Sequence, residues 1–463
     1  MRRACAVAVV AAVACESGMA ASPRQVREHV EIASGARLKA VVWEIGGDPD
    51  VRRFDHFFDL ARNEECAFVD GERANVAPGP VYYCLPRGAA VHDVDGLLAL
   101  YEDASCTAPV ALSPFDGPSG YVVARPRDAC AASFVVHRAG APRTIEPYVR
   151  TDDGCLPRGG PAVVQSLGEV IPLASFVRAV EEPALADTRI RPLVLAAADG
   201  ARQPLGGWDD ERKEVVRVPN AAVLGEARWF PARVAFAGGG TVLFSRPGCE
   251  APALTKNARD AQCPLTAAFA YSGECGGGDY VALGARLDPA TLWQEDGSGR
   301  CVGADGGAGA SVLAFARGPV IPRASFAEAV PTERGAGRVR LHGYAFAFDT
   351  FYDTATSAPC APMPAADGTT RCLPTVSASG VLFADPACTI PALEQHPDPC
   401  GLAPLPAFVR SSGRVFEVTD EVKALFERDG ASCRRRAVSA GARAYVLVEV
   451  DLEPFAPATT REL

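Results

Sequence analysis

The feature that most constrains this chain is an internal repeat. A block that begins with Leu and an aromatic residue and ends in Cys-x-x-Pro occurs three times, at 100–109, 243–252 and 382–391. Self-similarity of this kind indicates one supersecondary unit that is used repeatedly along the chain. The architecture is therefore predicted from the repeat before any single element is assigned.

Other motifs keep the same order around this block. An aromatic residue followed by Asp lies upstream in each copy, and a Pro-containing tail closes each copy. A length of 463 residues is also what about three domains of ~150 residues would need. The predicted parts are a signal segment at 1–20 and three tandem homologous units at 36–184, 185–334 and 335–463.

The N-terminus is typical of a secretory signal, because two arginines precede an apolar run at 4–15 that is too short to span a bilayer. Two processing routes are open. Cleavage after Ala20 would release a free protein, whereas 12–15 resembles a bacterial lipobox, whose Cys15 would be lipidated. Both routes predict an extracytoplasmic protein, either secreted or held as an outer-envelope lipoprotein.

The cysteines support an oxidising compartment. Without Cys5 and Cys15, fourteen of the 16 cysteines remain, an even number suited to disulfides. No CxxC pair occurs, and the cysteines are not interleaved with histidine at the spacing of zinc ligands. We therefore predict disulfides, with no metal and no cofactor.

Comparison of the copies predicts two of the pairs. The second unit lacks the counterparts of Cys66 and Cys84 together, and Trp229 stands where the second of them would be. Joint absence predicts the bonds Cys66–Cys84 and Cys360–Cys372, each worth roughly 2–4 kcal/mol, with Trp229 filling the vacated space. The remaining expected pairs are Cys106–Cys130, Cys249–Cys263, Cys388–Cys400 and Cys275–Cys301, with Cys155 and Cys433 unpaired or bonded to each other.

Short apolar and β-branched runs between Gly, Pro and Asp residues predict strands throughout the chain. Helical periodicity is sparse and predicts short helices at 174–180, 324–330 and 419–428. The fold class is therefore mainly β, in disulfide-stapled β-rich units with few short helices. The formal charge of −10 argues against nucleic acid and anionic lipid as partners, so a membrane is expected only through a lipid anchor.

Catalytic motifs are scarce. The sequence has no G-x-S-x-G, H-E-x-x-H or P-loop, and none of its six histidines holds an equivalent place in all three copies. The cluster at 92–96 is either a calcium site that uses Asp93 and Asp95 beside His92 or an acidic hairpin tip.

The recurring aspartates Asp59, Asp209 and Asp353 admit two interpretations. They are ligand-contacting carboxylates, or they cap turns while the neighbouring aromatic residue packs inside.

The order of motifs, aromatic-Asp, Cys-Leu-Pro and Leu-Phe-x-Asp-x-x-Cys-x-x-Pro behind a secretion signal, resembles an uncharacterised repeat family of secreted proteins and lipoproteins. That family belongs to GC-rich predatory soil bacteria, and a chain with lysine only at 39, 213, 256 and 423 fits such a genome. The resemblance implies a place in the cell envelope but no activity.

Two functions follow from these observations. The first is a non-enzymatic, surface-associated binding or structural protein whose partner is an extracellular or envelope protein or a glycan, since tandem copies extend a binding surface. The alternative is a secreted hydrolase or ligand-binding enzyme with a site between units that uses His56, His92 and Asp93.

Overall fold

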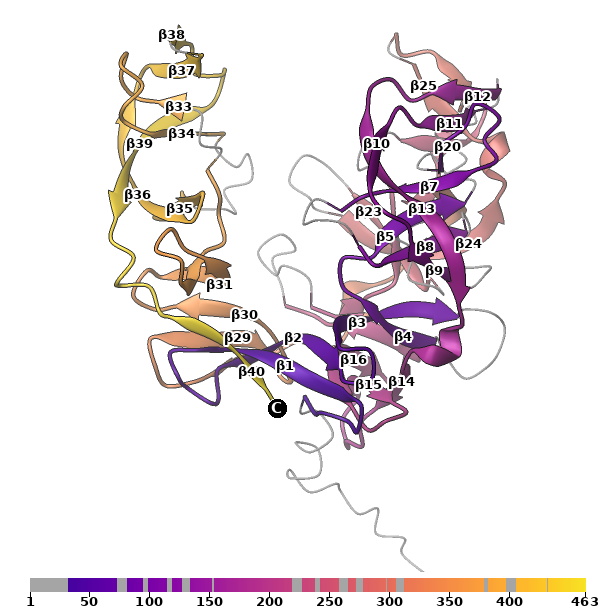
Figure 1. Ribbon diagram of the computed structural model, residues 1–463. Helices are drawn as coiled ribbons and strands as arrows, with labels where there is room; N and C mark the ends of the chain where they lie inside the picture. Colours follow the sequence, from indigo (N-terminus) through magenta and orange to yellow (C-terminus); the bar gives the residue numbers. More distant parts are fainter. Residues whose placement is uncertain are drawn as a thin grey trace, which may run out of the picture.

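The fold is mainly β, as the sequence predicts, with strands in every part of the computed structural model that is described (Figure 1). The described residues are 32–72, 81–94, 99–114, 119–126, 134–151, 154–218, 227–237, 242–257, 265–271, 278–296, 298–304, 312–378, 382–396, 405–430 and 432–463.

A base of paired strands lies at the bottom of Figure 1, and each predicted unit contributes a set of strands to it. The first set is β1 (Leu38–Ile45), β2 (Arg52–Asp59), β3 (Glu64–Glu72), β4 (Val81–Pro86) and β14 (Arg178–Pro183). The second is β15 (Ile190–Ala197), β16 (Arg202–Asp209), β17 (Glu214–Arg217), β18 (Phe230–Pro231) and β28 (Pro331–Arg334). The third is β29 (Val339–Tyr344), β30 (Ala347–Asp353), β31 (Ala358–Pro364), β32 (Thr370–Pro374) and β40 (Ala458–Glu462).

Together, the three sets of strands form a closed ring. A 10-stranded sheet runs from β18 through β14 and β4 to β1 and β40, and a 5-stranded sheet runs from β28 to β32. Two isolated bridges, Arg228↔Glu328 and Arg371↔Pro457, join the ends of the two sheets. The C-terminal strand β40 pairs with β1 from Val41↔Glu462 to Ile45↔Ala458, so the two ends of the chain complete the circuit.

The first hairpin of each set also packs on a neighbouring set. Ala197 and Ala201 of the second set lie against the core of the first, which contains Cys66 and Cys84. Ile45 and Val51 of the first set likewise join the core of the third, and Tyr344 and Phe346 of the third join that of the second. The base is therefore a head-to-tail ring in which every set covers the core of another.

A β-bulge lies at the same place in the first hairpin of each set, with its extra residue in the second strand. The register shifts at Val41/Val42, Leu193/Val194 and His342/Gly343. Because an inserted residue changes which side chains of its own strand point to each face of a sheet, Phe54 and Phe57, on either side of the bulge in β2, both lie against the core of the first set.

Three further bodies, here called the lobes, stand on the same side of the base (Figure 1). Each is formed by the chain between the fourth strand of a base set and the returning tail.

The strands of the first lobe form one sheet with a parallel pair, β5 and β8, at its end. They are β5 (Ala90–Val94), β6 (Leu100–Tyr101), β7 (Pro109–Leu112), β8 (Tyr121–Pro126), β9 (Val135–Ala139), β10 (Arg143–Ile145), β11 (Tyr148–Thr151), β12 (Gly154–Pro157) and β13 (Ala162–Ile171).

The second lobe contains a closed barrel, β19-β22-β27-β24-β23, and a small sheet beside it. Its strands are β19 (Val234–Ala237), β20 (Leu243–Arg246), β21 (Glu250–Pro252), β22 (Leu254–Asn257), β23 (Ala267–Tyr271), β24 (Gly278–Leu287), β25 (Trp293–Glu295), β26 (Cys301–Gly303) and β27 (Val312–Val320).

The third lobe is two sheets, β33-β37-β38 and β34-β39-β36-β35. Its strands are β33 (Leu382–Phe383), β34 (Ala392–Gln395), β35 (Phe408–Ser411), β36 (Arg414–Val422), β37 (Leu425–Asp429), β38 (Ser432–Arg436) and β39 (Arg443–Val450).

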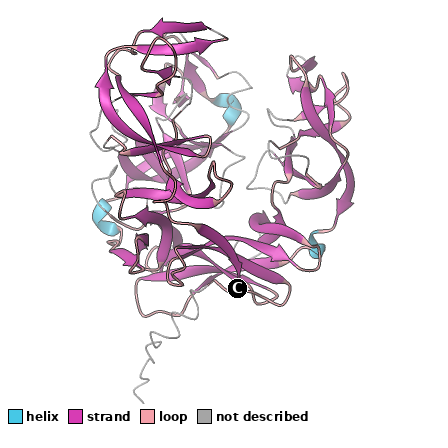
Figure 2. Ribbon diagram, turned by 60° about the vertical axis from the view of Figure 1, so that its left-hand side comes forward, coloured by secondary structure: helices cyan, strands magenta, loops and turns pink. Residues whose placement is uncertain are grey.

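Helices are single turns in the described residues, drawn in cyan in Figure 2. They are η1 (Leu173–Ser175), η3 (Pro289–Thr291) and η4 (Arg323–Ser325). The expected helix at 419–428 is wrong, because these residues lie in β36 and β37, where pairing with β39 and β38 overrides a weak helical preference. At 174–180 and 324–330 the helical turn ends early and the chain continues into the base.

Two predicted disulfides, Cys66–Cys84 and Cys360–Cys372, are present, with Cα atoms 5.3 and 5.2 Å apart. The other expected pairings are corrected by the bonds Cys106–Cys155, Cys249–Cys301 and Cys388–Cys433. The prediction joined cysteines close in sequence, but in the first lobe β11 pairs with both β6 and β12 and brings Cys155 beside Cys106 across 49 residues. Cys155 and Cys433 are therefore bonded, to partners in their own lobes, and Cys301 does not pair with Cys275. The cysteines Cys15, Cys130, Cys263, Cys275 and Cys400 lie outside the described residues.

Candidate functional site

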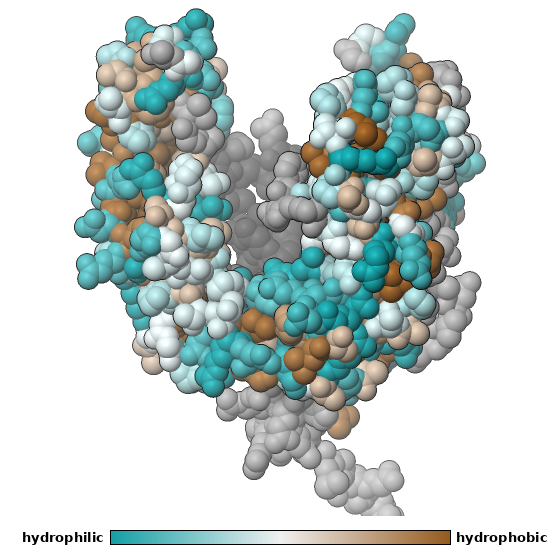
Figure 3. Space-filling view, in the orientation of Figure 1, coloured by the Kyte–Doolittle hydropathy of each residue, from teal (hydrophilic) through white to brown (hydrophobic). Residues whose placement is uncertain are grey.

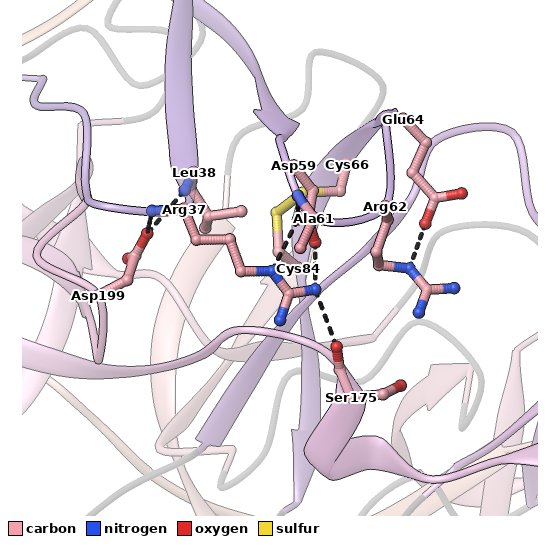
Figure 4. Close-up of a disulfide and its surroundings, with 10 residues drawn as sticks. All are labelled: Arg37, Leu38, Asp59, Ala61, Arg62, Glu64, Cys66, Cys84, Ser175 and Asp199. Carbon is pink, nitrogen blue, oxygen red and sulfur yellow. Dashed lines mark hydrogen bonds and ion pairs between the residues drawn. A yellow bond between two sulfur atoms is a disulfide. The ribbon is translucent and has the colours of Figure 1, made fainter.

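The recurring aspartates end the second strand of each base set, and their side chains point into the base. Asp59, Asp209 and Asp353 are fully buried. In the first set, Arg37 donates to Asp59 from Nε at 2.7 Å and from Nη2 at 2.6 Å (Figure 4). Such a two-point contact fixes both partners, because the planar guanidinium matches the carboxylate.

The other two sets repeat this ion pair. Arg189 donates to Asp209 from Nη2 at 2.8 Å, and Arg338 donates to Asp353 at 2.7 and 2.6 Å. Each carboxylate also accepts the backbone N–H two residues later, at 2.9–3.0 Å. The aspartates thus cap the turn that follows the strand.

The arginines extend this contact to the returning tails. Arg37 Nη2 donates to the carbonyl of Ser175 at 2.9 Å, and Arg189 Nη2 donates to that of Ser325 at 2.7 Å. The tail also pairs with the fourth strand of its own set, where the N–H groups of Cys84, Trp229 and Cys372 each donate to a tail carbonyl at 2.9 Å. In the first and second sets, the arginine of the Arg–Asp pair therefore also binds the tail to the base.

The aromatic residue before each aspartate points to the opposite face of the sheet, since neighbouring side chains alternate along a strand. These residues are Phe58, Trp208 and Tyr352, and all three are half-buried. A basic residue lies directly across the first hairpin from each of them. The register pairs, here called the aromatic–basic pairs, are Phe58↔Lys39, Trp208↔Arg191 and Tyr352↔Arg340.

This face of the sheet is the one on which the lobes stand. Further along it, on the fourth strands, Leu85, Phe230 and Leu373 are buried in clusters that contain lobe residues. The aromatic–basic pairs lie on the same face, on the first two strands. Figure 3 shows the molecule hollowed between the third lobe on the left and the other two on the right, and the floor above β1, β2 and β16 is mostly hydrophilic.

Carboxylates accompany the second and third aromatic–basic pairs. Arg191 binds Asp210 at 2.6 Å, and the indole N–H of Trp208 donates to the same carboxylate at 3.2 Å. Desolvation alone would raise the pKa of Asp210, but the hydrogen bond and charge of Arg191 hold it below its ordinary value.

In the third set, Glu333 bonds both Arg340 and His342, and the imidazole of His342 stacks on Tyr352 with ring centroids 4.4 Å apart. The hydrogen bond from Arg340 lowers the pKa of Glu333.

In the first set, His56 lies two residues before Phe58 and is buried. Its Nδ1 is 2.8 Å from Asp55 and its Nε2 is 3.6 Å from Glu65, while Arg87 lies 3.2 Å from Asp55. Burial would raise the pKa of Asp55, but the hydrogen bond from His56 and the charge of Arg87 hold it low. The cluster is a network of paired charges on the lobe-bearing face.

The residues of the proposed calcium site are placed differently. His92 is buried in the first lobe, where Nδ1 is 2.9 Å from the carbonyl oxygen of Val110 and the ring meets the edge of Tyr101. Residues 92–94 belong to β5, which pairs in parallel with β8, so this part of the motif is a strand and not a hairpin tip. Asp93 lies in that strand, and Asp95 lies outside the described residues.

His56 and His92 have separate partners, on the base and inside the lobe. Within the described ranges, no three side chains of His, Cys, Asp or Glu are grouped so that they could hold a metal ion. In the same residues, no helix is long and apolar enough to cross a membrane.

Sequence reasoning identified the aspartates but missed both the arginines that bind them and the exposure of the aromatic residues. The available signal is an Arg followed by an apolar residue at the start of each unit, at 37, 189 and 338. Because that dipeptide is common, it gains meaning only through its repetition ahead of the aromatic-Asp motif.

One comparison with known proteins gives a match. Residues 177–392 are similar to the family of unknown function DUF7481. The matched segment begins just before β14, contains the second base set and the whole second lobe, and ends at the first residue of β34. No curated protein and no solved structure matches the chain. The chain thus contains an uncharacterised domain, with disulfides that are typical of an oxidising, extracytoplasmic compartment.

Proposed function

We propose that this chain is an extracytoplasmic, surface-associated binding protein built from three homologous units, which together present three lobes to a partner. The observation that carries the proposal is the closed base with all lobes on one side of it (Figure 1). A ring that is closed by the pairing of β40 with β1 fixes the lobes relative to one another, and fixed copies of a site strengthen binding to a repetitive partner.

The positions of the two chain ends support attachment of the protein through its base, on the side away from the lobes. The first described residues bridge to the base at Ala33↔Arg202, and the C-terminal strand also belongs to the base. A lipid on Cys15 or a free N-terminus at Ala21 would therefore both precede a segment that enters on the base. In the lipoprotein form, the lobes would point away from the membrane.

The localisation half of the proposal is tested in the native host. Membrane and medium fractions are separated, and intact mass is measured with and without reduction. We expect a chain that begins at Cys15 with a lipid or at Ala21 without one, with its cysteines oxidised. A cytoplasmic chain that keeps residues 1–20 and has free thiols would contradict the proposal.

The binding half is tested with the purified, oxidised mature protein. It is mixed with isolated cell envelopes of the host and of other bacteria, and depletion from the supernatant is measured after sedimentation. We expect saturable depletion that is lost when the disulfides are reduced and the protein is unfolded. A folded protein that stays in solution with every envelope preparation would contradict the proposal.

A further inference from the structure

We infer that Phe58, Trp208 and Tyr352 are three equivalent stacking sites for a neutral polysaccharide, one in each base set. The inference rests on the proposed binding function and names its ligand class. It begins from the position that these rings share. Each is one residue before a buried Arg-bound aspartate, opposite a basic residue, and on the face of the base that carries the lobes.

Packing in a hydrophobic core does not account for the three rings, although Tyr352 has one face stacked on His342. Among the hydrophobic clusters of the described residues, none contains Phe58, Trp208 or Tyr352, whereas the neighbours Phe57 and Phe351 are core members. A half-exposed aromatic ring gives up part of the free energy of burial that the position could supply. Its occurrence in all three sets indicates a role for the ring itself.

Stacking on a sugar is a role that a flat, half-exposed ring performs. The face of an aromatic ring carries negative charge, and the axial C–H bonds of a pyranose form an apolar, slightly positive surface. The hydroxyl groups around that surface need donors and acceptors that are fixed in place. The second and third sets offer them as Arg191 with Asp210 and as Arg340 with Glu333.

Exposure of these polar groups fits the same role. The side chains of Asp210 and Arg191 are 34% and 22% exposed, and those of Glu333 and Arg340 are 42% and 37% exposed. In the first set, Glu65 lies opposite Phe58 in the strand register and its side chain is 54% exposed, and Arg87, 3.5 Å from Glu65, is 42% exposed. Each pair thus keeps part of its hydrogen-bonding capacity open to solvent on the same face as the ring.

Charge selects a neutral polymer. Arg191 and Arg340 each have a carboxylate partner, and the whole chain carries a formal charge of −10. An anionic polymer would have to compete with Asp210 and Glu333 for these cations, and it would be repelled by the net charge. A neutral polysaccharide keeps the ion pairs intact and gains hydrogen bonds from both members.

Repetition selects a polymer over a single sugar. One stacked ring contributes only ~0.5–1.5 kcal/mol, which is too little for stable binding by itself. Sites fixed on one closed base would engage successive parts of one chain, and linkage of weak sites raises the overall affinity by roughly 10²–10⁴.

The test uses affinity electrophoresis and calorimetry of the oxidised mature protein with laminarin, dextran and galactomannan as neutral probes and alginate as an anionic one. The decisive variant carries Phe58→Leu, Trp208→Leu and Tyr352→Leu, because leucine keeps an apolar side chain and removes the ring. We expect each single substitution to weaken binding of one neutral probe by about two- to tenfold and the triple variant to abolish it.

Two controls separate stacking from folding. Leu205→Ala removes an exposed apolar side chain from the same strand as Trp208 and should leave binding unchanged. Tyr352→Phe keeps the ring and should bind nearly as well as the wild type. All variants must retain their disulfides and melting temperature, and the single substitutions decide the outcome if the triple variant does not fold.

Three results would overturn the inference: unchanged binding by the folded triple variant, binding of alginate alone, or binding of none of these polysaccharides. If the protein binds none of them but still sediments with envelopes, the inference fails while the proposed function stands. If it binds neither, both fail.

Discussion

The first and second base sets share one register but fill their cores differently. In the first, Cys66 pairs with Pro86 across the strands and is bonded to Cys84. In the second, Val216 pairs with Pro231 in the same way, and Trp229 takes the place of the second cysteine. The hydrogen bond from that position to the tail is 2.9 Å in both. The covalent bond is therefore not what sets the topology.

A second substitution accompanies the tryptophan. Gly207 of the second set stands where the first has Phe57, which is fully buried and pairs with Cys66. A Cβ at Gly207 would lie 3.1 Å from the indole of Trp229 and 3.0 Å from Val216. The indole thus occupies space that a phenylalanine ring and a disulfide share elsewhere, so one site can be filled by covalent or by purely apolar means.

The largest effect is expected from Trp229→Ala. The side chain is 2% exposed and stacks on Phe346 with ring centroids 5.2 Å apart, so its loss leaves a cavity between two base sets. We expect a loss of about 3–5 kcal/mol in the free energy of unfolding. Denaturant unfolding followed by hydrogen exchange should locate the loss in β15–β18. A loss below ~1 kcal/mol would show that the indole is not a core residue.

A smaller effect is expected from Cys66→Ala with Cys84→Ala. The bond closes a loop with a sequence separation of 18, and its removal should cost about 3 kcal/mol by relaxing the unfolded chain. Fast hydrogen exchange in β1–β4, with β15–β18 unchanged, is the expected result. An equal increase in hydrogen exchange in both sets would mean that the ring unfolds as one unit and that the two sets do not have separate cores.

Replacing the tryptophan-filled core of the second set with the disulfide-containing core of the first should change the free energy of unfolding even less. The triple variant Gly207→Phe, Val216→Cys and Trp229→Cys gives the second set the residues of the first. We expect the new disulfide to form and the stability to fall within about 1–2 kcal/mol of the wild type, because total volume is kept. Gly207→Phe alone is the matched control, and it should overpack the core and destabilise the protein. Peptide mapping without reduction detects the bond, and free thiols at both positions would refute the shared geometry.

The sequence predicted the parts of the fold that are local or repeated. Joint absence of two cysteines predicted Cys66–Cys84 because the copies act as controls for one another. The bonds in the lobes were missed because Cys155 reaches Cys106 through strand order, which no short motif specifies. The ring closure was missed for the same reason, since β40 and β1 lie at opposite ends of the chain.

The candidate site, too, was predicted only in part. The aromatic-Asp motif was found, yet the face to which each residue points was not. Alternation along a strand requires that Phe58 and Asp59 point in opposite directions, but it does not say which direction is inward. That depends on Arg37, which is distant in sequence and makes burial of the carboxylate favourable.

The smallest predicted effect concerns the lobe tips, where the second unit again differs. In the first lobe, Asp103 accepts the N–H groups of Ser105 and Ala108, on either side of Cys106, whereas Arg246 stands at the corresponding place in the second lobe. In the second lobe, Asp296 accepts the hydrogen bonds instead, in the turn before Cys301, the disulfide partner of Cys249. The hydroxyl of Ser298 and the N–H groups of Arg300 and Ser298 lower the pKa of Asp296 from 3.8 to about 2.

Because this pKa is lowered in the fold, the turn should be intact above about pH 4 and should loosen as the pH falls through about 2. The effect is local, since the carboxylate is on the surface. Amide chemical shifts of Ser298 and Arg300 report the titration, and Asp296→Asn should remove it while the signals of the first lobe tip stay as they are. A midpoint near pH 4 in the wild type would mean that these hydrogen bonds do not persist in solution.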